Sequence, residues 1–154
     1  MRVADVMKRE VVTIRENATI SELGKLLATR GISGAPVVDR HGRLVGVVSL
    51  TDIVSHLRLP HRVDFYRELW MENVSYGYSE NLDTADSGIL VRDIMSPFPC
   101  TVCETDDVIE AARLMVEHGY HRIPVTDSEG RLRGIVSTMD VLRLMVSTNS
   151  LIQR

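Results

Sequence analysis

Residues 31–52 read GISGAPVVDRHGRLVGVVSLTD, and residues 119–140 read GYHRIPVTDSEGRLRGIVSTMD. The two stretches align without a gap at an offset of 88 residues, with turn-forming and polar residues at the same places. The identical pairs are Gly31/Gly119, Pro36/Pro124, Val37/Val125, Asp39/Asp127, Gly42/Gly130, Arg43/Arg131, Leu44/Leu132, Gly46/Gly134, Val48/Val136, Ser49/Ser137 and Asp52/Asp140. Chance similarity does not place glycine, proline and aspartate in register in this way, so the chain contains an internal repeat.

The repeat extends toward the N-terminus of both stretches. Its further identical pairs include Val3/Val91, Asp5/Asp93, Met7/Met95 and Thr13/Thr101. An opening turn, VADVM or VRDIM, comes first in each copy, and a short extended run, VVTI or CTVC, follows it. The duplicated segments are therefore residues 3–53 and 91–141.

Both copies predict the same order of elements, β-α-β-β-α. Apolar residues at helical spacing predict a first helix, and Gly31 and Gly119 are expected to end it as left-handed C-caps. The turns DRHG and DSEG place Asp first and Gly last, as a tight connection between antiparallel strands requires. A second helix is expected from about residue 50 or 138. The apolar positions of the first helix are Ile20, Leu23, Leu26 and Leu27 in one copy and Val108, Ala111, Leu114 and Met115 in the other.

The repeat also predicts the fold class and the domain boundaries. One unit of about 50 residues buries too little surface to be stable alone, so we expect two units packed together. The predicted fold is α+β (α/β), with the two sheets packed face to face around a pseudo-two-fold axis. We expect repeat one at 1–58, an aromatic-rich connection at 59–90, repeat two at 91–148 and a C-terminal tail at 149–154.

The paired blocks GISGAPVVD…GRLVGVVSLTD and GYHRIPVTD…GRLRGIVSTMD, each after a DVM or DIM opening, resemble the repeats of CBS domains. The pair resembles a Bateman module, and the likeness covers about two thirds of the chain. This resemblance implies a non-catalytic sensor that binds AMP, ADP, ATP or S-adenosylmethionine in clefts between the repeats. It also implies a homodimer arranged as a disk of four repeats. A purely structural dimerisation module with vestigial clefts is the alternative.

An adenosine ligand needs three kinds of contact, and the sequence offers candidates for each. A carboxylate accepts hydrogen bonds from both ribose hydroxyls at once, and Asp52 and Asp140 in S-x-x-D match this need. The start of a helix offers free N–H groups and a favourable dipole to phosphate. Adenine needs an apolar slot edged by backbone groups. The candidates are Thr13, Ile14, Ala35, Pro36, Ser49, Thr51 and Asp52 in repeat one, and Thr101, Val102, His121, Arg122, Ile123, Pro124, Ser137, Thr138 and Asp140 in repeat two.

The repeats differ before the Pro-Val pair. Repeat two carries His121-Arg122 where repeat one carries Ser33-Gly34. A His-Arg pair here resembles the phosphate-contacting residues of nucleotide-binding CBS proteins, and arginine supplies a planar, permanently charged fork. A solvated charge pair is the alternative for His121-Arg122, as a simple helix N-cap is for the Ser and Asp of S-x-x-D. Because the same pair occurs twice, we expect ligand binding in at least one copy, and we favour the cleft with Asp140 and Arg122.

Five of the seven aromatic residues lie in the connection between the repeats, which begins with a predicted helix at HRVDFYRELWMENV. They suit packing against a second subunit or partner, or a cap on the core of the module itself. The helical faces of repeat two, with Leu142, Leu144 and Met145, also need cover, which favours self-association. The five aromatic residues are Phe65, Tyr66, Trp70, Tyr76 and Tyr78.

Composition and motifs exclude several other classes. The net charge of −3 comes from basic and acidic residues mixed along the chain, which disfavours direct nucleic-acid binding. No window approaches the about 18 apolar residues of a membrane span, and no signal peptide is visible, so we expect a cytoplasmic protein. Cys100 and Cys103 form a lone C-x-x-C without a second zinc knuckle, so no metal site is expected. No nucleophile, metal cluster or P-loop accompanies Asp52 and Asp140, which argues against an enzyme. Since the repeats fill most of the chain, we expect it to regulate an unknown protein in trans.

Overall fold

The structure is a computed structural model that describes residues 1–57 and 88–152. The described chain forms two compact units that do not coincide with the two sequence repeats. The repeat-one unit contains Thr13–Arg40 and the described parts of Val45–Phe98. The repeat-two unit contains Met1–Val12, His41–Leu44 and the chain from Pro99 onward. The five aromatic residues of the predicted connection and its predicted helix lie outside the described residues.

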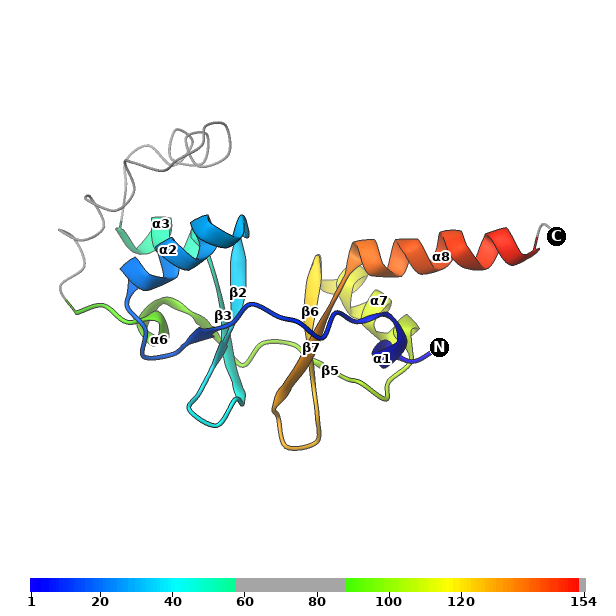
Figure 1. Ribbon diagram of the computed structural model, residues 1–154, viewed down its shortest axis with the longest axis horizontal. Coiled ribbons are helices and arrows are strands. Elements are labelled where there is room, and N and C mark those ends of the chain that lie inside the picture. The colour runs from blue at the N-terminus through cyan, green and yellow to red at the C-terminus, as the bar shows by residue number, and fades with distance from the viewer. Residues whose placement is uncertain (58–87, 153–154) are drawn as a thin grey trace. The chain divides into compact units, whose positions relative to one another are not determined.

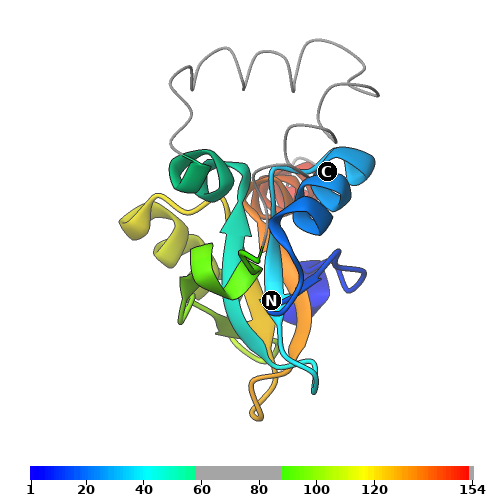
Figure 2. The same cartoon turned by 90° about the vertical axis from the view of Figure 1, so that its left-hand side faces the viewer.

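The repeat-one unit is a four-stranded sheet in the order β1-β2-β3-β4 with helices on one face (Figures 1 and 2). Strands β1 and β2 are parallel, and β4 is antiparallel to β3. Its strands are β1 (Ile14–Arg15), β2 (Gly34–Val38), β3 (Leu44–Ser49) and β4 (Ser96–Pro97), and its helices are α2 (Ile20–Arg30), α3 (Leu50–Leu57) and α6 (Val91–Ile94).

The repeat-two unit is a three-stranded sheet in the order β5-β6-β7, again with helices on one face (Figure 1). Strand β5 is parallel to β6, which is antiparallel to β7. Its elements are α1 (Val3–Val6), β5 (Val102–Cys103), α7 (Val108–His118), β6 (Arg122–Thr126), β7 (Leu132–Ser137) and α8 (Thr138–Ile152). The predicted β-α-β-β-α order is therefore present in both units.

The predicted turns and caps are confirmed by the backbone. Gly31 ends α2 with φ 61° and Gly119 ends α7 with φ 68°, both in the left-handed region that glycine adopts without strain. The two hairpin turns end on Gly42 and Gly130, with φ of 77° and 76°. These four glycines explain why the two copies match at these positions.

The opening segments are exchanged between the two units. The opening turn of repeat one, α1, belongs to the repeat-two unit, where Val3 N–H donates to Asp106 C=O at 2.9 Å. Lys8 and Ile135 exchange two backbone hydrogen bonds of 2.9 Å in the same unit. In the repeat-one unit, Val91 N–H of α6 donates to Ala18 C=O at 2.8 Å. The predicted opening turns are single-turn helices, α1 and α6.

Each unit buries its own apolar core. In the repeat-one unit, the buried side chains of α2 and α3 pack on β2 and β3 together with Val91 of α6. In the repeat-two unit, Val3 and Met7 of the exchanged opening pack with the residues of α7, β6 and β7. The opening segments therefore complete the cores. Each Å² of apolar surface that they bury stabilises the fold by about 25 cal/mol. Helix α8 continues to Ile152 and so extends into the range 149–154 that was expected as a C-terminal tail.

Candidate functional site

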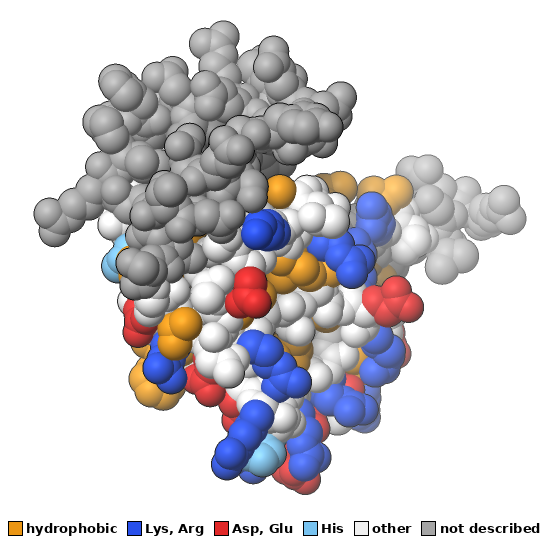
Figure 3. All heavy atoms as spheres, turned by 60° about the vertical axis from the view of Figure 1, so that its left-hand side comes forward, with side chains coloured by type: hydrophobic (Ala, Val, Ile, Leu, Met, Phe, Trp, Pro, Cys, Tyr) orange, Lys and Arg blue, Asp and Glu red, His pale blue; other side chains and the backbone are white. Residues whose placement is uncertain are grey.

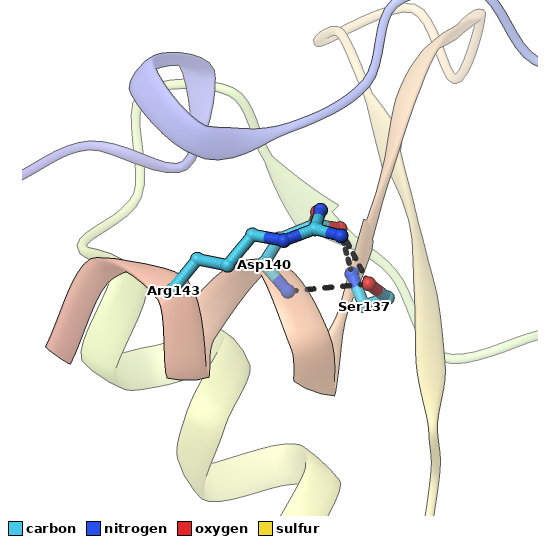
Figure 4. Close-up of polar contacts among 3 residues, drawn as sticks. All are labelled: Ser137, Asp140 and Arg143. Atoms are coloured by element: carbon cyan, nitrogen blue, oxygen red, sulfur yellow. Dashed lines mark hydrogen bonds and ion pairs between the residues drawn. The ribbon is translucent and has the colours of Figure 1, made fainter. Parts of the chain in front are cut away.

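The predicted Ser-x-x-Asp residues of repeat two form a closed hydrogen-bonded box at the junction of β7 and α8 (Figure 4). Asp140 Oδ2 accepts hydrogen bonds from the backbone N–H of Ser137, at 2.9 Å, and from its hydroxyl. The hydroxyl oxygen of Ser137 accepts in return from Asp140 N–H at 3.3 Å. The Asp140 side chain is only 7% exposed. The box caps α8 and fixes the carboxylate at the first turn of the helix.

The second carboxylate oxygen of Asp140 faces a basic side chain. Arg143 extends along α8 toward the box, and its Nη1 lies 3.4 Å from Asp140 Oδ1 (Figure 4). The two residues lie three positions apart on one helix, which places them on the same face. The Arg143 side chain is 67% exposed, so the pair joins a buried carboxylate to a guanidinium in solvent.

Repeat one has the two serine-to-aspartate hydrogen bonds of this box without the basic partner. Asp52 Oδ2 accepts from Ser49 N–H at 2.7 Å and from the Ser49 hydroxyl at 2.9 Å. Asp52 is half-buried and makes no ion pair with any described residue. Ser55 occupies the position that corresponds to Arg143. In both repeats the Oδ2 atom of the aspartate accepts the hydrogen bonds from serine, and the Oδ1 atom takes no part in these bonds.

The residues before the Pro-Val pair lie next to these boxes. Arg122 is paired directly with Ser137 across β6 and β7, and His121 C=O accepts from Thr138 N–H at 3.1 Å. The same bond in repeat one runs from Leu50 N–H to Ser33 C=O at 2.9 Å. The His121 and Arg122 side chains are exposed. The structure therefore brings the predicted phosphate-binding residues beside the predicted ribose acceptor of the same repeat.

The residues predicted to hold adenine lie mostly in the two cores. Val102 and Ile123 are buried members of one core and Ala35 of the other, and both prolines are buried. Thr13, Ile14 and Thr101 are half-buried. Parallel pairing of β5 with β6 and of β1 with β2 brings each threonine-containing run beside the Pro-Val run of its own repeat. Contacts of the buried residues with a ligand would thus have to come from backbone edges.

A hollow of about 570 Å³ opens beside Asp140, entirely within the repeat-two unit. It lies between the segment from α1 to Lys8 and the first turns of α8. Among the predicted site residues, only Asp140 lines it. Lys8 and Arg143 are not among the predicted site residues. The D-x-x-R spacing of Asp140 and Arg143 in MDVLR could have indicated Arg143, because it places the two residues on one helix face. The side chains that shape the hollow include Asp5, Val6, Lys8, Asp140, Arg143 and Leu144.

Other features concern metal and charge. No group of three or more His, Cys, Asp or Glu side chains within residues 1–57 and 88–147 is arranged to hold a metal ion. Cys100 and Cys103 are free thiols. Basic and acidic side chains lie among one another on the face that Figure 3 shows. Within the described residues, no helix has both the length and the hydropathy needed to cross a bilayer.

Two α+β units, each with a Ser-x-x-Asp motif at a strand-to-helix junction, define a tandem-repeat α+β module. The CBS domain family matches the chain twice, over residues 3–59 and 91–147. The chain therefore belongs to the CBS domain family as a tandem pair.

The chain is similar to a chloroplastic CBS domain-containing protein of Arabidopsis thaliana, CBSX1, with 31% identity over 140 residues. The alignment covers 88% of this chain and 59% of CBSX1, so the chain spans less than two thirds of that relative's length. Among solved structures, CBSX2 in complex with AMP is 27% identical with a TM-score of 0.72, covering 96% of this chain and 98% of that chain. The CBS domain pair of MJ0100 is bound to 5′-methylthioadenosine and S-adenosyl-L-methionine. It is 25% identical with a TM-score of 0.68 and covers 96% and 98% of the two chains.

Proposed function

We propose that this chain is a non-catalytic regulatory module that binds an adenosine nucleotide of the AMP, ADP or ATP class beside the Ser137–Asp140 box. One observation carries the proposal. The Asp140 carboxylate is nearly buried and accepts hydrogen bonds from Ser137 through one oxygen. Its other oxygen lies 3.4 Å from the exposed Arg143 guanidinium, and the residue lines an open hollow. A carboxylate oxygen in this position can accept hydrogen bonds from ribose hydroxyls without loss of the helix cap.

The basic residues around the box support a phosphorylated ligand. Arg122 lies across the strand pair from Ser137, and Lys8 and Arg143 line the hollow. Guanidinium groups make charge-assisted hydrogen bonds to phosphate, which are stronger than neutral ones. The hollow also lies within the range of about 300–1,000 Å³ that is usual for small-molecule sites. CBSX2, which has a similar fold, binds AMP, and this supports the choice of ligand class.

S-adenosylmethionine is the second candidate ligand, because the CBS pair of MJ0100 binds it and 5′-methylthioadenosine. Both compounds offer ribose hydroxyls to a carboxylate but no phosphate. Titration calorimetry with AMP, ADP, ATP, S-adenosylmethionine and NAD separates the two candidates. Heat from the phosphorylated ligands above that of S-adenosylmethionine supports the proposal. If no compound of the panel gives heat or raises the melting temperature at millimolar concentration, the proposal is wrong.

Analysis of the products in the same incubations tests the non-catalytic role. We expect stabilisation of the protein with recovery of unchanged nucleotide. Turnover of any nucleotide would instead indicate an enzyme.

We further propose that the chain acts as a homodimer, and the outer faces of α7 and α8 support this. Several large apolar side chains are exposed there, whereas the described side chains of α2 and α3 expose none. Exposed apolar surface of this kind favours an interface. The light-scattering mass at tens of micromolar, with and without AMP, tests it, and a monomer under both conditions would defeat it. The exposed residues are Ile109, Val116, Met139, Leu142, Met145 and Val146.

A further inference from the structure

The ion pair between Asp140 and Arg143 occupies the carboxylate oxygen that the proposed ligand needs. Asp140 Oδ2 is committed to Ser137, so ribose hydroxyls have to approach Oδ1, which lies 3.4 Å from Arg143 Nη1. Arg143 and the ribose therefore compete for the same oxygen. The pair is long, at 3.4 Å, and its arginine end is mostly in solvent, so its separation costs little.

Once displaced, the guanidinium of Arg143 remains next to the ligand. Arg143 lines the same hollow as Asp140, and Lys8 lies on the wall formed by the N-terminal segment. A long side chain with a planar, permanently charged head can turn from a carboxylate to a phosphate that enters the hollow. Lys8 and Arg143 bring two positive charges to the lining of the hollow, beside the negative charges of Asp5 and Asp140.

We infer that Arg143 is a specificity-determining residue of the Asp140 site: it covers the carboxylate when the site is empty and binds the phosphate when ribose takes its place. This inference rests on the proposed nucleotide site and assigns that site to phosphorylated nucleotides. S-adenosylmethionine carries a sulfonium cation at the position where the nucleotide carries phosphate, so it offers Arg143 no anion at that position. Its carboxylate lies at the far end of the methionine chain.

Repeat one provides the internal contrast. Ser55 stands where repeat two has Arg143, and Asp52 makes no ion pair with a described residue. The Asp52 box therefore lacks both the competitor and the phosphate-binding head. Phosphate selectivity is consequently expected at Asp140 and not at Asp52.

The test is titration calorimetry of the full chain with AMP and adenosine, for the wild type and for Arg143→Gln. Glutamine keeps helix propensity but has no charge, so the fold should be kept and the melting temperature should fall only slightly through loss of the ion pair. We expect AMP to bind about tenfold or more weakly, since a charge-assisted hydrogen bond to phosphate is lost. Adenosine should bind about two- to fivefold more tightly, since the competing ion pair is gone.

Arg113→Gln is the matched control. Arg113 is also exposed and pairs with an acid three residues away, Glu110, at 2.7 Å, but it does not line the hollow. Its replacement should leave both affinities unchanged. Equal weakening of AMP and adenosine by Arg143→Gln, or no change in either, would overturn the role of Arg143 while the nucleotide site stands. If wild-type protein binds neither compound, it is the proposed function that fails.

Discussion

The two repeats are alike where the fold needs particular residues and different where a ligand would bind. The shared glycines end helices and turns at positive φ, and the shared Ser and Asp cap the second helix of each repeat. Around these boxes, repeat two has Arg122 and Arg143 where repeat one has Gly34 and Ser55. The comparison indicates that Ser-x-x-Asp alone serves the fold, whereas the basic residues beside it in repeat two support the proposed binding site.

Removal of the carboxylate from each repeat should break this comparison most clearly. Asp140→Ala should weaken AMP binding by about 1.5–3 kcal/mol, because hydrogen bonds to a charged group are lost. Asp52→Ala should weaken it less, while both changes should destabilise the fold by about 0.5–2 kcal/mol through loss of a cap. Titration calorimetry and thermal unfolding of both variants measure these effects. Loss of AMP binding in Asp52→Ala alone would mean that repeat one holds the nucleotide.

The exchanged openings can be compared through the glycines that face them. A Cβ at either glycine would meet a methionine side chain and a backbone oxygen. The backbone oxygen is that of Lys8, at 2.8 Å, for Gly134 and that of Ser96, at 3.0 Å, for Gly46. Gly134→Ala should therefore cost about 1–3 kcal/mol of unfolding free energy, as overpacking does, and Gly46→Ala should cost less. Urea denaturation of the two variants compares them. Equal losses of unfolding free energy would show that the shorter backbone contact at Gly134 makes no difference to stability.

Arg122 sharpens the comparison at the strand before the box. Arg122→Ala should weaken AMP binding by about 1.5 kcal/mol, because the proposed phosphate contact is lost. Adenosine, which has no phosphate, should lose little. Calorimetric titration with the two ligands shows the difference directly. If both ligands weaken equally, Arg122 supports the strand pair with Ser137 and does not recognise phosphate.

The hairpin turn of repeat two offers the smallest effect, and it depends on pH. Hydrogen bonds from the backbone N–H groups of Arg131 and Glu129 hold the pKa of Asp127 below its ordinary value. The charged form is thus favoured by folding, and its contribution is present at neutral pH. It is lost as the pH falls below the unfolded value of about 3.9 and through the lower folded pKa. Asp127→Asn should reduce the loss of stability between pH 7 and pH 3 in denaturant titrations. An unchanged loss would exclude this contribution.

Local features of the fold could be predicted from the sequence, because each depends on neighbouring residues. The C-caps at Gly31 and Gly119 and the turns at Gly42 and Gly130 follow from the conformational freedom of glycine. The exchange of the opening segments could not be predicted. Repetition shows which residues are alike, but it does not show which of two identical surfaces a segment packs on.

The candidate site was predictable in part for the same reason. The Ser137 and Asp140 pair is local, and its repetition in the sequence identified it. The hollow depends on Lys8, which lies far from Asp140 in the sequence and reaches the hollow only because the opening segment packs on the repeat-two unit. The proposed ligand selectivity of the box would thus depend on tertiary structure.

The exchange of openings also limits how the gene can be divided. A polypeptide of residues 88–154 would contain all of repeat two but would lack Val3 and Met7, which are buried in its core. A polypeptide of residues 1–57 would lack Val91, which is fully buried in the core of repeat one. Neither half carries a complete interior, so each should expose apolar surface and aggregate when expressed alone. The smallest heritable and transferable module is consequently the pair, and recombination that moves a single repeat would produce a chain that cannot fold by itself.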